Sequence, residues 1–594
     1  MGHTFHIPVL GLGYSIDTPL KVARYGISST ISIVDDELVE RLRQYHTGNT
    51  GKKFDSIAKS AYDHRAKRVT AYLNLIDELV DQQFENIRKQ DFIEGNDICR
   101  YFELLPEESQ LRQGYELMME YPDGERKTIF QNLLRKMMVK GAADVNIMAK
   151  VDKMNFTADG NYMGDENTDA LAALRGFANS TLKSSVVLSA GMNPRLYSYL
   201  ETFDVFLPDE NGGFNKKIIL KVSDFRSAFI QAKFLAKKGL WVSEFRVESG
   251  LNCGGHAFAT EGFLLGPILA EFKDRRQEML DELFNLYNAA ITEKGIALNK
   301  TPIQRLSVQG GIGTADENNF LLKQYNLDGT GWGSPFLLVP EASNVDDDTL
   351  TRLADATDDD FYVSDSSPLG ILFNNFKNST MEEQRLARLE KGRPGSPCTK
   401  KFLVSNTEFT AEPICTASRQ YQDLKIKQIK SSELAIHQQN EQIAAVTQKI
   451  CLCEGLCTSA YLKYGIVKPK ETKAVAICPG PNLSYFSRIY SLEEMVGHIY
   501  GKTDLLSTIA RPHVFVKELS LYVDYLQKDI QTHLKDLSGK KQKQLIKFKT
   551  QLQHGIAYYK ELFDKLPDAG GMFDIICDEL GIYEAKLNTL LIAE

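Results

Sequence analysis

The chain has 594 residues, a formal net charge of −8 at pH 7 and a sequence pI near 5.8. This acidic balance argues against a protein whose main partner is a nucleic acid or an anionic membrane. No stretch reaches the roughly 18 apolar residues that span a bilayer, and no apolar leader follows Met1. We therefore expect a soluble, cytoplasmic protein of two or three structural units that acts on a small molecule.

Residues 1–35 have the pattern that opens a βαβ unit: a strand, a turn, a helical stretch and a second strand. Gly11-Leu-Gly13 follows the first strand, with Asp35 and Asp36 further on, an order that imitates a dinucleotide-binding fingerprint. The third glycine of that fingerprint is missing, and Pro19 falls where the helix should start. A first barrel strand explains the pattern better.

The middle of the chain predicts a barrel interrupted by helices. Over residues 36–140 apolar side chains recur at spacings of three and four, which predicts four or five helices standing over the barrel mouth or forming a subunit contact. From Ala142 to Pro340 strand-like runs alternate with helical patterns, as in a parallel α/β sheet. We predict an α/β fold, a TIM (β/α)8 barrel formed by residues 1–35 and 141–377, with residues 36–140 as the insertion.

Two glycine-rich stretches, Val308-Gln-Gly-Gly-Ile-Gly-Thr314 and Gly331-Trp-Gly-Ser-Pro-Phe336, each follow a short apolar run. In a (β/α)8 barrel the loops after strands seven and eight present backbone N–H groups that bind a cofactor phosphate. The paired spacing and order predict a phosphate-bearing cofactor rather than simple tight turns. The residues that would hold the phosphate are Gly310, Gly311, Gly313, Gly333 and Ser334.

Upstream of these stretches, a strand pattern from Trp241 ends in Cys253-Gly-Gly-His256. Together with the opening Ile7–Ser15 and the segment Asp144-Val-Asn146, this order resembles the FMN-dependent nitronate monooxygenase (2-nitropropane dioxygenase) family. That family is similar in fold to FMN-dependent enoyl-ACP reductases. The resemblance covers about residues 7–377, whereas the helical insertion and the last 200 or so residues have no counterpart in compact members.

The resemblance implies FMN as cofactor and assigns candidate residues around it. Asn146 would meet the flavin ring, and Lys221, at a strand end, would place positive charge near the reduced ring. The other residues expected beside the ring are Gly11, Gly13, Gly254 and Gly255. His256 matches the family's catalytic base, although a histidine that only caps a loop is the alternative. Cys253 is either a second proton donor or a buried, inert thiol.

Three functions stay open at this point. The first is an FMN-dependent oxidoreductase of the nitronate monooxygenase class that acts on a small activated carbon acid. The second is an NAD(P)H-dependent flavin reductase of double bonds, with an iron–sulfur centre as a further electron carrier. The third, of another class, is a flavin-binding or metal-binding scaffold without catalysis.

Residues 378–594 predict a cysteine-containing, mostly helical C-terminal domain, with a break at Gly392-Arg-Pro-Gly-Ser-Pro397, a long polar helix over about Ser418–Lys449, and amphipathic helices from Leu492 onward. We expect homo-oligomers to form through these helical additions. Six of the nine cysteines fall between Cys398 and Cys478, and a reduced compartment favours thiols there over disulfides. Soft thiolates suit an iron–sulfur cluster or zinc. The candidate ligands are Cys451, Cys453, Cys457 and Cys415, with Cys398 or Cys478 as alternatives for the fourth.

Overall fold

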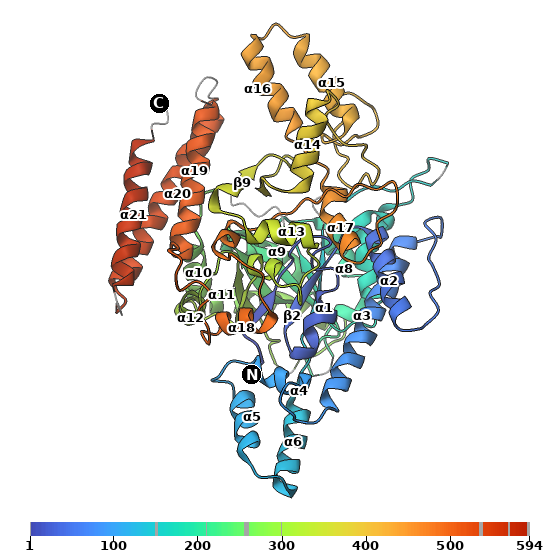
Figure 1. Cartoon of the computed structure of the whole chain (residues 1–594), viewed down its shortest axis with the longest axis vertical. Helices are drawn as coiled ribbons and strands as arrows, with labels where there is room; N and C mark the ends of the chain where they lie inside the picture. The colour runs from blue at the N-terminus through green and yellow to red at the C-terminus, as the bar shows by residue number, and fades with distance from the viewer. Residues whose placement is uncertain are drawn as a thin grey trace.

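The computed structural model describes residues 2–148, 152–157, 159–209, 211–254, 261–298, 300–533, 538–567 and 571–590. Its centre is a closed barrel of eight parallel strands in sequence order (Figure 1). The first and last strands close the barrel by pairing Phe5 with Thr330 and His6 with Gly331. The strands are β1 (Phe5–Ile7), β2 (Ser28–Ile33), β3 (Ala143–Ile147), β4 (Ser185–Leu188), β5 (Lys217–Val222), β6 (Val242–Glu248), β7 (Arg305–Gln309) and β8 (Gly329–Gly331). The predicted TIM-barrel fold is confirmed.

Helices surround the barrel, so most residues of its strands are buried on both faces. Polar caps set where several of these helices begin. The Asp35 carboxylate, for example, accepts hydrogen bonds from the N–H groups of Glu37 and Leu38 at the start of α2. The surrounding helices are α1 (Thr18–Val22), α2 (Asp36–Asn49), α3 (His64–Arg88), α7 (Asp169–Ala178), α8 (Pro194–Leu200), α9 (Phe225–Ala236), α10 (Leu265–Asp274), α11 (Arg276–Glu293), α12 (Ala315–Gln324) and α13 (Asp347–Ala354).

The interior of the barrel holds a buried charged group near its amino-terminal end. The Arg246 guanidinium contacts Asp144 and Glu244 at 2.7 Å each, and Ser307 donates a hydrogen bond to Glu244 at 2.7 Å. His6 lies beside this group, with its Nε2 atom 3.4 Å from Gln309 Oε1. These contacts join β1, β3, β6 and β7 across the barrel axis.

Residues 36–140 are helical, as predicted, but not above the mouth. Helices α4 (Asp97–Glu103), α5 (Gln110–Glu120) and α6 (Glu125–Met137) project from the end of the barrel opposite the mouth (Figure 1). The placement over the mouth is wrong because α6 leads directly into β3 and must deliver the chain to the amino-terminal end of that strand. At this point the chain passes very close to Ile27, and only glycine fits at position 141, because a Cβ on Gly141 would lie 2.0 Å from the Ile27 carbonyl oxygen.

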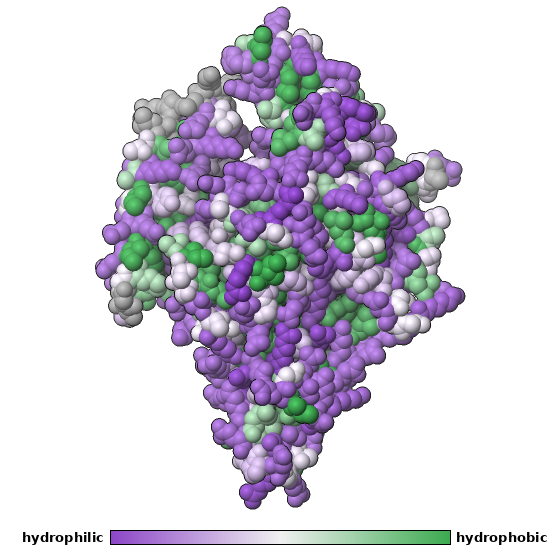
Figure 2. Space-filling view, viewed as in Figure 1, coloured by the Kyte–Doolittle hydropathy of each residue, from purple (hydrophilic) through white to green (hydrophobic). Residues whose placement is uncertain are grey.

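The surface of the molecule is mostly hydrophilic, with apolar side chains in small scattered patches (Figure 2). One such patch lies at the tip formed by α5 and α6. Leu117, Ile129 and Leu133 on these helices are 49%, 61% and 52% exposed. The subunit contact expected for the helical insertion stays a prediction.

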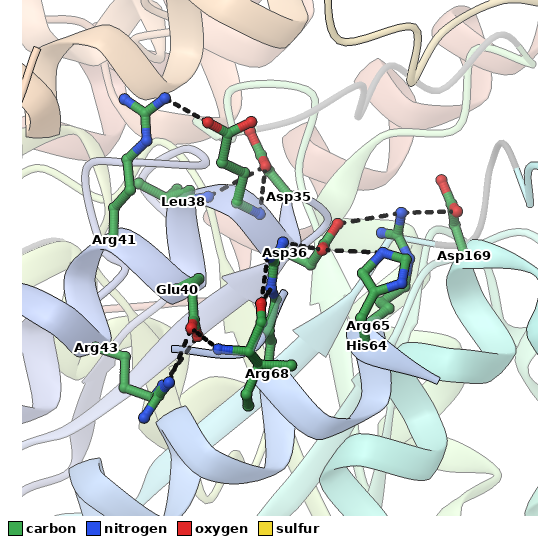
Figure 3. Close-up of polar contacts among 12 residues, drawn as sticks. Asp35, Asp36, Leu38, Glu40, Arg41, Arg43, His64, Arg65, Arg68 and Asp169 are labelled. Atoms are coloured by element: carbon green, nitrogen blue, oxygen red, sulfur yellow. Dashed lines mark hydrogen bonds and ion pairs between the residues drawn. The ribbon is translucent and has the colours of Figure 1, made fainter. Parts of the chain in front are cut away.

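A network of ion pairs lies directly after the carboxyl end of β2 and links the helices beside it (Figure 3). The Asp36 carboxylate contacts Arg68 at 2.9 Å and Arg65 at 3.2 Å, and Arg65 also contacts Asp169 at 2.9 Å. The network therefore joins α2, α3 and α7. The neighbouring Asp35 carboxylate pairs with Lys400, which belongs to the C-terminal part of the chain.

The C-terminal part covers the barrel mouth. The Gly13 N–H donates to the Leu456 carbonyl at 2.9 Å, the Tyr14 hydroxyl donates to the Ala476 carbonyl at 2.6 Å, and one hydrophobic cluster runs from Phe5 to Leu587. Two short strands, β9 (Phe361–Ser364) and β10 (Phe373–Phe376), pair antiparallel beside it. The helices are α14 (Thr380–Glu390), α15 (Arg419–Lys430), α16 (Ile436–Thr447), α17 (Leu452–Lys463), α18 (Leu492–Ile499), α19 (Val514–His533), α20 (Gly539–Asp564) and α21 (Met572–Thr589).

The long helix predicted over Ser418–Lys449 is wrong, because two helices, α15 and α16, pack against each other there. The chain leaves the first helix at Ser431 and Ser432, whose hydroxyls donate to the carbonyls of Gln428 and Ile429. Serine side chains compete with helical hydrogen bonds in this way and favour a turn. Within the part of the chain that the structure describes, no helix is both long enough and apolar enough to cross a membrane.

Candidate active site

A cavity of about 340 Å³ opens at the carboxyl ends of the barrel strands. This end of a (β/α)8 barrel carries the active site in enzymes of that fold. Strands β1 to β6 and the residues that follow them supply the floor and walls, and segments from beyond the barrel close the top. The residues that close it are Phe373, Phe402, Leu403, Leu452, Cys453, Leu456 and Cys478. An apolar cover over a few polar wall residues is typical of small-molecule sites.

Asn146 lies in the cavity wall near the end of β3, as predicted. Its Nδ2 group donates a long hydrogen bond to Ser32 Oγ at 3.4 Å. Its buried Oδ1 atom has no hydrogen-bond partner among the described residues. Because a buried acceptor without a partner is costly, this oxygen is available to a donor on a bound molecule.

Lys221 and Glu248 form an ion pair in the same wall, with Nζ and Oε1 3.2 Å apart. The Glu248 carboxylate also accepts hydrogen bonds from Asn252 at 2.8 Å and Gln309 at 2.9 Å. Three donors thus fix this carboxylate, which in turn holds the lysine at the cavity. Lys221 was predicted from the sequence, whereas Glu248 was not. The sequence signal for Glu248 is a charged residue at the end of a barrel strand.

The glycines predicted beside the ring divide into three groups. Gly11 and Gly254 line the cavity, and Gly254 has a φ of +74°, with a Cβ position only 2.1 Å from the Val9 carbonyl oxygen. No other residue fits that position without moving the backbone. Gly13 lies elsewhere, where a Cβ would sit 2.9 Å from the Leu456 carbonyl oxygen of α17. Gly255 and the predicted catalytic base His256 lie outside the described residues.

The loops after β7 and β8 come together as predicted, but the chain's own atoms fill the space beside them. A Cβ at Gly310 would lie 2.9 Å from the Asn252 nitrogen, one at Gly311 2.5 Å from a Leu251 methyl group, and one at Gly333 2.5 Å from Cys253 Sγ. Ser334 packs against Gly480 in the same way, because a Cβ added to Gly480 would lie 2.4 Å from Ser334 Oγ. These contacts give a packing reason for the glycines.

An internal carboxylate takes the anion position at the start of α12. Glu317 accepts the Gly313 N–H at 2.8 Å and pairs with the Arg511 guanidinium at 2.5 Å. Burial alone would raise the pKa of Glu317, but Arg511, His513 and the Gly313 N–H together outweigh it and hold that pKa below its ordinary value. The Gly313 N–H that was expected to bind phosphate is therefore already used within the chain.

Cys253 is buried away from the cavity. Its thiol lies 3.8 Å from the Val9 carbonyl oxygen, and burial raises its pKa to about 12. The group is a protonated thiol at neutral pH, and it is not among the residues that line the cavity. The geometry favours the inert, packed reading of this cysteine over the proton-donor reading.

The predicted metal ligands do not gather as one set. Cys457 donates from its thiol to the Asp35 carboxylate at 3.5 Å, and Cys478 lines the barrel cavity. Cys415, Cys451 and Cys453 lie together with Cys398 around a second, smaller cavity. In the described ranges, no three histidine, cysteine, aspartate or glutamate side chains already converge on a point that would hold a single metal ion.

No protein-family model and no curated protein sequence matches the chain. Among solved structures, the enoyl reductase domain of MlnA from the macrolactin biosynthesis cluster of Bacillus amyloliquefaciens is similar to it at 14% sequence identity. That similarity covers 73% of this chain and 87% of the other, with a TM-score of 0.30. A TM-score this low carries no weight for function.

Proposed function

We propose that the barrel cavity is the active site of a flavin-dependent oxidoreductase of the nitronate monooxygenase class, acting on a small activated carbon acid. The observation that carries the proposal is Asn146, a residue of the cavity lining whose buried Oδ1 atom has no hydrogen-bond partner among the described residues. The edge of a flavin ring carries an N–H donor of the kind that this oxygen needs.

The residues of the cavity fit the ring of a flavin better than its phosphate. Asn146 would accept a hydrogen bond from the ring edge, and Gly11 and Gly254 would let the ring approach the backbone. The Lys221 ammonium, held by Glu248 at 3.2 Å, would compensate negative charge on the reduced ring. The phosphate is not assigned to Gly313, because Glu317 already accepts that N–H.

When bound, a flavin supplies the electron storage that no amino-acid side chain offers. The chain's own contribution is then positioning and proton transfer. The apolar cover formed by residues such as Phe402 and Leu456 excludes water from the reacting atoms. His256 is proposed as the base that removes a proton from the carbon acid, on the resemblance alone, since it lies outside the described residues.

The first test is the identity of the bound chromophore and its dependence on Asn146. Wild-type protein is expected to hold FMN after purification or reconstitution. Asn146→Ala, which removes the buried acceptor, is expected to weaken flavin binding by about tenfold, the effect of one hydrogen bond. Fluorescence titration with FMN measures the dissociation constant. Lys237→Met, at an exposed position directly after α9, is the matched control and should leave the dissociation constant unchanged. Absence of flavin binding by the wild type would overturn the proposal.

The reaction class is separated by what reduces the flavin under anaerobic conditions. Reduction by a nitroalkane or its nitronate but not by NAD(P)H supports the monooxygenase class. His256→Ala should then abolish reduction by the neutral nitroalkane, whose proton must be removed, while the preformed nitronate still reduces the flavin and FMN stays bound. Reduction by NAD(P)H followed by oxidation by an enoyl substrate supports the double-bond reductase instead. Bound flavin that neither reagent reduces would support the non-catalytic scaffold.

A further inference from the structure

Four cysteines from three separate segments surround a small cavity of about 10 Å³ next to the barrel mouth. Cys398 lies in the loop after α14, Cys415 lies in the loop before α15, and Cys451 and Cys453 lie at the start of α17. All four are thiols rather than disulfides, and three of them are buried. The fold therefore collects four soft ligands that the sequence spreads over more than fifty residues.

The four side chains lie around one small space, since all of them line the same cavity. Cys457, one helical turn after Cys453, is outside the group because its thiol faces Asp35. The set of four is therefore Cys398, Cys415, Cys451 and Cys453.

The loop that carries the first cysteine has an unusual backbone. Cys398 and Lys401 both adopt left-handed conformations, with φ of +58° and +57°. Non-glycine residues rarely adopt this conformation, which costs about 1–2 kcal/mol per residue. Here it forms a tight turn that places both Cys398 and Lys401 in the lining of the small cavity.

The surroundings also carry positive charge, since Lys400 and Lys401 line the same small cavity. A metal bound by four thiolates keeps a net negative charge, because the ligands contribute more charge than the metal. Lys401 is placed to compensate it, whereas Lys400 is already paired with Asp35.

We propose that Cys398, Cys415, Cys451 and Cys453 form a tetrathiolate centre for a thiophilic metal, either a zinc ion or an iron–sulfur cluster. On binding, the four thiols release their protons to solvent and the sulfur atoms turn inward about χ1 to reach the metal. The inward turn is required because these side chains do not yet converge on one point among the described residues. The proposal does not depend on which cofactor the barrel holds.

A zinc ion and an iron–sulfur cluster would affect the barrel cavity differently at this position. Leu452 and Cys453 line both the small cavity and the barrel cavity. The metal would thus be one side chain away from the proposed active site. An iron–sulfur cluster there would exchange single electrons with a cofactor in the barrel, whereas zinc would fasten the cover of the cavity.

The test measures metal and acid-labile sulfide in full-length protein purified without oxygen, together with its visible spectrum. We expect about one zinc per chain, or iron and sulfide in equal amounts with broad visible absorbance that dithionite bleaches. Single Cys→Ser variants at the four positions should lose most of the metal. Cys457→Ser and Cys577→Ser, outside the group, should keep it.

A second measurement covers variants that fail to fold. Wild-type protein is alkylated with iodoacetamide before and after treatment with a chelator, and the modified cysteines are identified by mass spectrometry. Chelator-dependent labelling of the four cysteines, and not of Cys99 or Cys577, supports the centre. Protein that binds neither zinc nor iron and sulfide after anaerobic reconstitution would overturn it, as would a Cys398–Cys415 disulfide in that protein.

Discussion

Replacing Arg511 with alanine is expected to lower the free energy of unfolding by about 3–5 kcal/mol, because it leaves a buried carboxylate without its counter-ion. The Arg511 and Glu317 side chains are only 4% and 5% exposed. Arg511 also donates to Asn482 Oδ1 at 2.9 Å and to the Gly311 carbonyl at 2.6 Å. The variant thus loses the main polar link between the C-terminal part and the loop after β7.

Denaturant unfolding, followed by circular dichroism, measures this effect. Arg275→Ala is the control, because Arg275 pairs with Glu271 and Glu278 at the surface and is 40% exposed. Its loss should cost far less stability than the loss of Arg511, because exposed ion pairs contribute little. Adding Glu317→Gln to Arg511→Ala should recover part of the loss by removing the uncompensated charge. Equal stabilities of Arg511→Ala and Arg275→Ala would contradict the role given to this pair.

Acid is expected to destabilise the protein through His6, by about 2 kcal/mol at pH 5. Burial, and next the positive charge of Arg246, lower the pKa of His6 from 6.5 to about 3. The unfolded chain therefore takes up a proton at this residue below pH 6.5, whereas the folded chain takes it up only near pH 3. Each pH unit between these values favours unfolding by about 1.4 kcal/mol.

Urea unfolding of the wild type and of His6→Asn between pH 7.5 and pH 5 isolates the contribution of this residue. The variant should be less stable at pH 7.5 because it loses packing, yet its stability should fall less steeply as the pH decreases. Burial would raise the pKa of Glu244, but Arg246 and its other neighbours hold that pKa at about 2, so Glu244 stays ionised throughout this pH range. His437→Asn, at an exposed position on α16, should keep the wild-type slope. Parallel slopes for the wild type and His6→Asn would exclude the histidine as a source of acid lability.

The barrel could be predicted from the sequence because its signals are local. Strand-like runs alternate with helical patterns, and parallel strands joined in this way have few possible arrangements. Lys221 could be placed for the same reason, since it lies near the end of a predicted strand, whereas Asn146 was placed by the family resemblance. Their role toward a flavin came only from the family resemblance and stays a prediction.

The rest of the site could not be predicted because it depends on contacts between distant segments. The cover of the cavity comes from residues such as Phe402 and Leu456, whose local patterns indicate only that they are buried. The glycines after β7 were recognised, but Arg511 and Glu317, which fill the place of the anion, have no sequence signal that joins them. Likewise, only the fold distinguishes Cys398 from Cys457 as a member of the cysteine group.

The cover of the barrel mouth has a consequence for how the molecule is made. Contacts that complete the barrel join residues almost a whole chain apart, as when the His3 ring meets the Tyr500 hydroxyl across 497 positions. Folds dominated by such distant contacts form slowly, because closing a long loop costs chain entropy before the stabilising contact is made. During synthesis the first barrel strands therefore wait for the last third of the chain with their apolar mouth uncovered. A chain interrupted after β8 would leave the ribosome as a substrate for chaperones and proteases rather than as a smaller working barrel.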